Sequence, residues 1–327
     1  MRSIRTCSLS FYAFMKNIVT LTLNPTIDKS TRVDQMVPEH KLRCDKAVYE
    51  PGGGGINVSR VLRRLTGDSL AIFTAGGHTG YFLQDLLAQE GVRQLPISIE
   101  DRTRENFIVL ETSTNHQYRF GLGGPTLSPN EWQKCLTVLE ELEPQPDFLV
   151  ASGSLPPGVP NDFYARVAGI ARKKNARFIL DTSGEALRLA ANEGVYLLKP
   201  NQQELSKLVG SELIQTEGVE GAARHIIHQG CCEVVVVSLG PEGAMLVSEN
   251  EVVRVPAPHV PKRSTVGAGD SMVAGMVWKL AQGTRLAEVV HFGVACGTAA
   301  IMNEGTELCH PADVERLFNQ LYTSAVN

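Results

Sequence analysis

The chain has 327 residues, of which 43% are hydrophobic and 20% are charged, as in an ordinary globular protein. Lysine and arginine number 31 against 35 aspartate and glutamate residues, so the charge balance gives no reason to expect a nucleic acid or an anionic membrane as partner. No apolar run reaches the length of a membrane span, and the seven cysteines show no C-x-x-C spacing, which favours a reduced, cytoplasmic protein.

The first fourteen residues carry Arg2 and Arg5, several serines and no acidic residue. This composition weakly resembles a transit peptide. We favour a simpler interpretation, in which Met15 is the natural start and residues 1–14 are an extension that is disordered or loosely attached. A single domain is then expected over residues 15–327.

Strand-like and helix-like segments alternate along most of the chain. The predicted strands are apolar runs, several of them continuous as in parallel strands covered on both faces: 18–23, 70–74, 148–151, 177–181, 196–198 and 234–238. The predicted helices are an amphipathic stretch around residues 58–65 and the segments 79–90, 129–142, 161–174, 216–229, 268–281 and 286–302. This alternation predicts an α/β domain with a largely parallel sheet flanked by helices.

Two stretches, residues 31–50 and 95–120, break the alternation. Each reads as short strands joined by polar turns, a pattern that suits a small, half-exposed sheet. We expect the two stretches to form a lid attached to the main domain.

The run Gly267-Ala268-Gly269-Asp270 opens the predicted helix 268–281. Glycines at a helix start let the backbone approach a ligand, and the free N–H groups there form an anion site together with the helix dipole. Asp270 could simply stabilise the helix start. Alternatively, its carboxylate could accept a hydroxyl proton beside the anion site, as phosphoryl transfer requires.

Four consecutive glycines, Gly52 to Gly55, precede Ile56 and Asn57. They exclude the interior of a helix or strand. One interpretation is a flexible loop. The other is a flat surface against which a polyol lies while Asn57 bonds its hydroxyl groups.

Two further segments directly follow apolar strands, where ligands bind in open α/β sheets. In the segment from Lys199 to Glu204, Asn201 and Glu204 either hold Mg²⁺ while Lys199 meets phosphate, or form a capping box without any metal. The segment Ser238 to Gly243 fits a nucleotide phosphate or ribose, and it equally fits a hairpin turn into a strand at 245–248. Both interpretations of this turn can hold together.

Taken in this order, the four segments resemble the signatures of the ribokinase/PfkB family of carbohydrate kinases, over residues 18–309. The run from Ser264 to Ser271 is the most specific and resembles the C-terminal signature, and the glycine-rich run resembles the N-terminal one. Residues 41–44, 52–57 and 152–158 resemble the phosphosugar branch, and within it the 6-phosphofructokinases. The resemblance implies a ribokinase-like sheet flanked by helices, with a small β-sheet lid.

The resemblance also implies an activity, in which ATP with Mg²⁺ phosphorylates the C1 hydroxyl of fructose 6-phosphate. Asp270 would be the catalytic base, and Gly267, Ala268 and Gly269 would supply the anion hole. The residues that would bind the sugar are Asp28, Gly53, Gly54, Asn57 and Ser154, and those that would bind its phosphate are Lys41, Arg43 and Arg104. The residues that would bind the nucleotide are Lys199, Asn201, Glu204, Ser238, Leu239, Gly240, Pro241, Glu242, Gly243, Gly267, Gly269 and Thr298, with Asn201 and Glu204 at Mg²⁺. A monovalent cation such as K⁺ would lie near Ser264, Val266, Ala300, Asn303 and Gly305.

Several alternatives remain open at this point. A tagatose-6-phosphate kinase or a 1-phosphofructokinase would share the motifs, although those relatives more often carry a lysine where Gly54 stands. A protein of another class, a non-catalytic phosphosugar sensor, would be expected to lack the base or the anion-hole glycines. Glu307 stands where close relatives carry a basic residue, so the sequence does not decide which residues form the cation site. We expect a homodimer paired through the exposed face of the lid.

Overall fold

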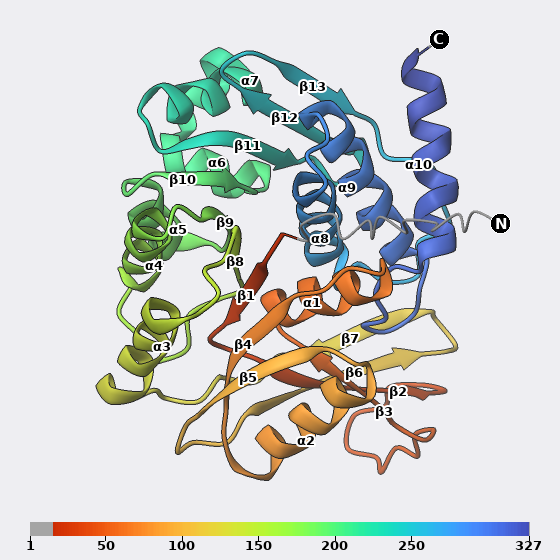
Figure 1. Ribbon diagram of the computed structural model, residues 1–327. Helices are drawn as coiled ribbons and strands as arrows, with labels where there is room; N and C mark the ends of the chain where they lie inside the picture. Colours follow the sequence, from red (N-terminus) through yellow and green to blue (C-terminus); the bar gives the residue numbers. More distant parts are fainter. Residues whose placement is uncertain (1–15, 327) are drawn as a thin grey trace, which may run out of the picture.

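A computed structural model describes residues 16–326, so the expectations for residues 1–14 and for a start at Met15 lie outside the described residues. Within this range the chain forms a nine-stranded sheet, a four-stranded sheet and ten α-helices (Figure 1). None of these helices is long and apolar enough to cross a membrane. The six cysteines of the described range are all unpaired.

The nine-stranded sheet has the order β13-β12-β11-β10-β9-β8-β1-β4-β5. Pairing is parallel from β5 to β11, and the last two strands pair antiparallel. In chain order the strands are β1 Ile18–Thr22, β4 Leu70–Ala75, β5 Arg93–Ser98, β8 Phe148–Ser152, β9 Arg177–Asp181, β10 Val195–Leu198, β11 Cys232–Ser238, β12 Ala244–Ser248 and β13 Val252–Val255.

Helices cover both faces of this sheet (Figure 1). They are α1 Gly54–Arg64, α2 Gly77–Gln89, α3 Pro129–Glu141, α4 Phe163–Lys173, α5 Gly184–Ala191, α6 Gln202–Val209, α7 Ser211–His228, α8 Ala268–Ala281, α9 Leu286–Ile301 and α10 Pro311–Val326. Helix α7 is interrupted at Gly218, which departs from helical backbone angles.

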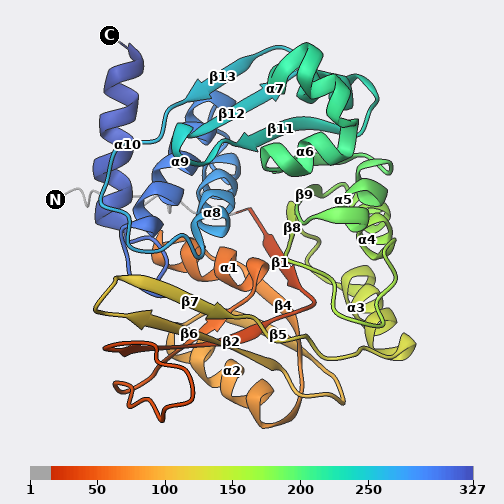
Figure 2. The same cartoon turned by 180° about the vertical axis from the view of Figure 1, so that it is seen from behind.

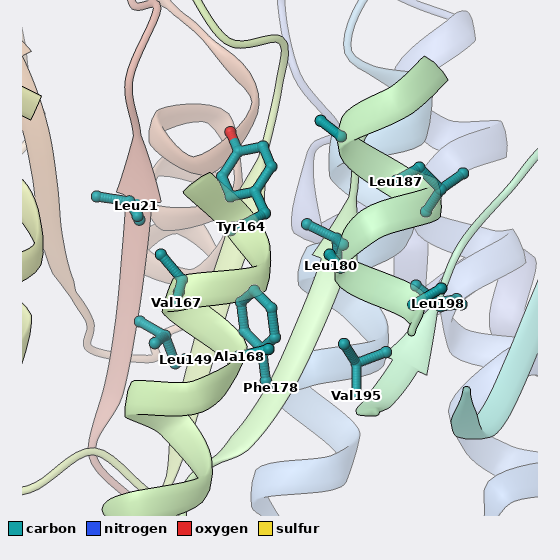
Figure 3. Packing of buried hydrophobic residues seen from close by; sticks show 14 of the residues in the cluster. Leu21, Leu149, Tyr164, Val167, Ala168, Phe178, Leu180, Leu187, Val195 and Leu198 are labelled. Atoms are coloured by element: carbon teal, nitrogen blue, oxygen red, sulfur yellow. The ribbon is translucent and has the colours of Figure 1, made fainter. Parts of the chain in front are cut away.

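The central strands are almost entirely apolar because successive side chains enter two different cores. Leu149 and Leu180 face the helices α3 to α7, where they pack with Tyr164 and Val167 (Figure 3). Val150, the next residue along β8, belongs to the other core, which is built from α1, α8, α9 and α10. The sheet is thus buried between two helical layers, which confirms the predicted α/β class.

The four-stranded sheet is the lid, with the order β3-β2-β6-β7. Its strands are β2 Thr26–Val33, β3 Val48–Gly52, β6 Arg104–Glu111 and β7 His116–Phe120. Figure 2 shows it beside α1 and α2, at the end of the molecule that is remote from β13. Hydrogen bonds such as Arg119 Nη2 to Thr265 Oγ1 (3.0 Å) tie it to the segment before α8.

All of the predicted strands are present with small changes at their ends, but two boundaries of the lid are wrong. Residues 95–98 lie in β5 and pair with β4 in the main sheet. β5 is the edge strand and is only partly buried, so in the sequence these residues resemble a lid strand. Conversely, the lid begins at Thr26, earlier than the predicted residue 31, so that Asp28 lies in the lid strand β2.

Candidate active site

Polar side chains stand at the carboxyl ends of five adjacent strands of the main sheet. In spatial order these residues are Ser238 at the end of β11, Lys199 after β10, Asp181 on β9, Ser152 on β8 and Thr22 on β1. The start of α8 lies over this row, since Asp270 contacts Ser152 and Lys199 lies beside Gly269. This is the edge at which open α/β sheets bind ligands.

Asp270 lies in the first turn of α8. The helix follows Gly267, whose φ of 73° is in the left-handed region, and a Cβ there would lie 2.5 Å from Leu308 Cδ2. Asn57 Nδ2 donates to Asp270 Oδ2 at 2.8 Å, and Ser152 Oγ lies 3.5 Å from Oδ1. Within residues 16–326 no backbone N–H donates to this carboxylate, so Asp270 does not cap its helix through a hydrogen bond.

The surroundings of Asp270 bring its ionisation close to neutral pH. Burial and the neighbouring carboxylate of Asp181 raise its pKa from 3.8 to about 6, against the opposing effects of Asn57, Lys199 and Ser152. A carboxylate with such a pKa is ionised at pH 7 and still basic enough to accept a proton.

The buried Lys199 forms an ion pair with Asp181 beside the start of α8. Lys199 Nζ lies 3.2 Å from Asp181 Oδ1, and a Cβ on Gly269 would lie 3.6 Å from the same Nζ. Burial alone would lower the pKa of Lys199, but the carboxylates of Asp181, Asp270 and Glu204 outweigh it and raise that pKa. Sequence reasoning did not single out Asp181, although an acid that ends a buried strand is a usable signal.

The glycine run packs against the strand ends. A Cβ on Gly54 would lie 2.2 Å from Ser152 Oγ, and one on Gly55 would lie 2.6 Å from Leu21 O. Thr22 Oγ1 accepts a hydrogen bond from the backbone N–H of Ile56 at 2.9 Å. The glycines therefore let the start of α1 approach β1 and β8, which brings Asn57 to Asp270.

A second polar group joins the lid to the main sheet. Asp28 on β2 is buried and accepts a hydrogen bond from Asn106 Nδ2 at 2.9 Å. Arg104 Nη2 donates to Asn24 O, and Asn24 Nδ2 donates to Ser154 Oγ, each at 3.1 Å. Asn24, which the sequence did not indicate, thus links Arg104 with Ser154.

Gly53 lies between these two groups. Its φ of 114° is unfavourable for residues with a side chain, and a Cβ would lie 2.8 Å from Thr22 Cγ2.

Lys41 and Arg43 are not brought to Asp270 within this chain. They lie in the loop between β2 and β3, which starts from the end of β2 opposite Thr26 (Figure 2). Both side chains are exposed and make no hydrogen bond within the described residues. Their implied contact with a sugar phosphate stays a prediction.

The two predicted nucleotide segments lie side by side. Asn201 pairs with Ser238 in an isolated parallel bridge, and Ser238 N donates to Pro200 O at 3.0 Å. Asn201 and Glu204 form the capping box at the start of α6, with both hydrogen bonds at 2.9 Å. Glu204 Oε1 takes no part in this box, so the cap leaves an oxygen that could hold a cation.

The turn after β11 is a hairpin into β12. A short 3₁₀ helix, Gly240–Glu242, forms the turn, and Leu239 N donates to Gly243 O at 2.8 Å. Ser238, Leu239, Pro241 and Glu242 are thus held next to the end of β10, with Leu239 buried and Glu242 exposed. The hairpin interpretation is confirmed, and it leaves the nucleotide interpretation open.

The predicted cation residues also come together. Ser264 Oγ donates to Gly305 O at 2.6 Å and accepts from Val266 N at 3.2 Å, while Asn303 N donates to Ala300 O at 3.2 Å. These loops flank the start of α8. The nearby stretch of α9 also carries the buried Thr298, next to Gly297, where a Cβ would lie 3.1 Å from Ala268 O.

Comparison with known proteins agrees with this geometry. A family model described as pfkB family carbohydrate kinase matches residues 19–313. The ATP-dependent 6-phosphofructokinase isozyme 2 of Escherichia coli (strain K12) is 46% identical over 308 residues, which cover 94% of this chain and 99% of that protein. The 1-phosphofructokinase of Bacillus subtilis (strain 168) is 33% identical over 292 residues, or 89% of this chain and 95% of that protein.

Solved structures show the same relationship. Phosphofructokinase-2 from Escherichia coli matches in complex with potassium (TM-score 0.90, 45% identity) and with fructose-6-phosphate (0.88, 44%), and in a tetrameric inhibited form (0.88, 45%), each covering 94% of this chain and 100% of that chain. Ribokinase from Thermotoga maritima, at 21% identity and a TM-score of 0.73, covers 93% of this chain and 99% of its own and shares the fold. The chain belongs to the pfkB family of carbohydrate kinases.

Proposed function

We propose that this chain is an ATP-dependent 6-phosphofructokinase, which converts fructose 6-phosphate and ATP into fructose 1,6-bisphosphate and ADP. The observation that carries the proposal is the setting of Asp270, held by Asn57 in the first turn of α8 with a pKa raised to about 6. The choice of sugar is supported by 46% identity to a 6-phosphofructokinase against 33% to a 1-phosphofructokinase.

Asp270 is the general base of the proposed reaction. Asn57 occupies Oδ2 at 2.8 Å, and Ser152 is only a weak partner of Oδ1 at 3.5 Å, so Oδ1 is free to accept the proton of the C1 hydroxyl. The C1 oxygen forms a bond to the γ-phosphorus while the bond from that phosphorus to the β–γ bridging oxygen breaks. ADP then leaves with the electron pair of the broken bond.

The start of α8 and Lys199 stabilise the transferring group. The first N–H groups of a helix have no partner within the helix and carry the positive end of its dipole. Gly267 and Gly269 leave these N–H groups accessible, and Lys199, paired with Asp181, places its ammonium group beside Gly269. Most of the rate enhancement in phosphoryl transfer comes from such positioning and charge stabilisation.

ATP lies, in this proposal, along the ends of β10 and β11. The turn from Ser238 to Gly243 holds the nucleotide, with the buried Thr298 on α9 as a further contact. Glu204 and Asn201 would hold Mg²⁺, and the free Glu204 Oε1 supports this fit. When bound, Mg²⁺ supplies positive charge to the phosphate oxygens. The remaining cation residues, around Ser264 and Gly305, would hold K⁺, as suggested by the potassium complex of the Escherichia coli relative.

The sugar lies between the glycine run and the lid. Asp28, Gly53, Gly54, Asn57 and Ser154 meet its hydroxyl groups, while Arg104 meets the 6-phosphate. Arg104 suits this role because its Nε is buried without a hydrogen-bond partner in the described residues. The lid excludes water, which would otherwise compete with the sugar for the phosphoryl group.

The chain acts, in our proposal, as a homodimer paired through the lid. Large apolar side chains on or next to the lid strands are exposed, including Val48 (57%), Phe120 (46%) and Leu122 (57%). Pairing would cover them and would bring Lys41 and Arg43 of one subunit toward the site of the other. Light scattering on the purified protein measures the mass, and a monomer at assay concentrations would contradict this part of the proposal.

A substrate panel tests the proposed activity. ADP release should be fastest with fructose 6-phosphate, compared with tagatose 6-phosphate, fructose 1-phosphate and unphosphorylated fructose. Phosphorus NMR of the product should show fructose 1,6-bisphosphate. A clear preference for another phosphosugar would reassign the substrate. Absence of turnover with every sugar would contradict the kinase activity and favour a sensor.

A further inference from the structure

A fully buried arginine lies one turn beyond Asn57 on α1. Arg60 is 1% exposed, and it is the largest of the fully buried side chains in the described chain. A guanidinium group stays charged when buried, so its partners must compensate the charge. Arg60 belongs to none of the segments with a predicted role, and the proposed mechanism does not use it.

Glu90, after α2, holds the guanidinium group of Arg60. Arg60 Nε lies 2.8 Å from Glu90 Oε2, and Nη2 lies 2.7 Å from Oε1, so the pair is bidentate. Glu50 on the lid strand β3 adds a second carboxylate at 3.5 Å. Arg60 Nη1 also donates to Pro51 O on that strand at 2.7 Å. The guanidinium plane is therefore fixed by segments from α2 and from the lid.

The same Nη1 donates to Asn57 Oδ1 at 3.3 Å. This contact determines which way the Asn57 amide faces, because an amide has an acceptor on one side and donors on the other. With Oδ1 toward Arg60, Nδ2 points to Asp270 and donates at 2.8 Å. A flipped amide would place two donors against each other at Arg60 and two acceptors against each other at Asp270.

We infer that Arg60 is a positioning residue for phosphoryl transfer, which acts through Asn57 on the carboxylate of Asp270. The inference rests on the proposed function, since it assigns a role in the same reaction. Arg60 holds the Asn57 amide in the orientation that donates to Oδ2, and this leaves Oδ1 of Asp270 directed to the sugar hydroxyl. Arg60 also contacts Glu50 and the carbonyl oxygen of Pro51 on the lid strand β3, so the orientation of the Asn57 amide is coupled to the position of the lid.

The charged groups that face Asp270 directly are Asp181 from β9 and Lys199 from the end of β10. Arg60 acts on it only through Asn57. Loss of the Asn57 donor removes an interaction that favours the charged carboxylate, so it raises the pKa of Asp270. The acid limb of the rate profile should then move to higher pH.

A double-mutant cycle tests the inference with the full-length protein and fructose 6-phosphate. Arg60→Lys keeps a positive charge opposite Glu90 but removes the guanidinium contact with Asn57. We expect kcat to fall about tenfold or more with KM for the sugar little changed, and the acid limb to move up in pH. In an Asn57→Ala background the same change should alter kcat by less than about twofold, because its route to Asp270 is gone. Arg63→Lys, on the exposed side of α1, is the matched control and should be silent.

Equal losses in the two backgrounds, or an unmoved acid limb in Arg60→Lys, would overturn the inference and leave Arg60 a structural residue. If Arg60→Lys does not fold, as judged by its thermal transition, the pair Arg60→Met with Glu90→Gln removes both charges and enters the same cycle. Absence of turnover in the unmodified chain would instead contradict the proposed function. Turnover with additive effects would contradict only the role of Arg60.

Discussion

The substitution Gly54→Ala adds one methyl group at the point where α1 meets β8. The new Cβ would lie 2.2 Å from Ser152 Oγ and 2.7 Å from the Ser152 carbonyl carbon. The hydroxyl group can rotate away, but the carbonyl carbon is backbone and cannot. An ordinary contact begins at 3.4 Å, so the two segments must separate by 3.4 − 2.7 = 0.7 Å.

This separation acts on both stability and catalysis. Overpacking of this kind destabilises a protein by about 1–3 kcal/mol, which exceeds the helix preference for alanine of about 1 kcal/mol. Asn57 and Ser152, the two partners of Asp270, lie on the two segments that move apart. Because a displacement of about 1 Å can reduce a rate 10²-fold, we expect kcat/KM to fall at least about tenfold.

Urea denaturation and ADP-release kinetics measure the two effects. Gly169→Ala on α4 is the matched control, since a Cβ there meets nothing within 4 Å. It should leave kcat/KM unchanged and raise stability by up to about 1 kcal/mol. A Gly54→Ala protein with unchanged stability and turnover would refute the packing argument for the glycine run.

Two further predictions concern Asp270. The kcat/KM of the unmodified chain should fall below a midpoint near pH 6, because protonation of Asp270, whose pKa is about 6 in the free protein, removes the base; a flat profile from pH 5 to 8 would contradict this. Asp270→Asn should also be more stable than the unmodified chain at pH 8, by at most about 3 kcal/mol. The folded-state pKa lies above the unfolded value, so the native state loses stability as pH rises from about 4 through 6, and the advantage of asparagine should disappear near pH 4. Thermal melts at both pH values measure it, and an advantage that is equal at pH 4 and pH 8 would contradict the cause.

The main sheet could be predicted because its central strands are buried on both faces and read as continuous apolar runs. The lid could not be bounded in the same way. An edge strand such as β5 and a lid strand such as β2 are each only partly buried, so neither forms a continuous apolar run in the sequence. Which sheet each strand joins depends on a distant partner, and no local pattern contains that information.

The candidate site was predictable where one short segment carries the chemistry. Gly267 to Asp270 and the capping segment Asn201 to Glu204 are examples, although a capping box and a cation site share one spacing. Asp181, Asn24 and Arg60 were missed because each gains its role from residues far away in the chain. The individual site roles remain predictions.

The rate of ADP release with fructose 6-phosphate, compared between the unmodified chain and Asp270→Asn at pH 8, shows whether Asp270 is the base. We expect turnover by the unmodified chain and a loss of about 10²–10⁴-fold in kcat for the variant. Because the asparagine side chain is nearly isosteric, affinity for the sugar should be retained. Turnover by Asp270→Asn at the rate of the unmodified chain would contradict the assignment of Asp270 as the base.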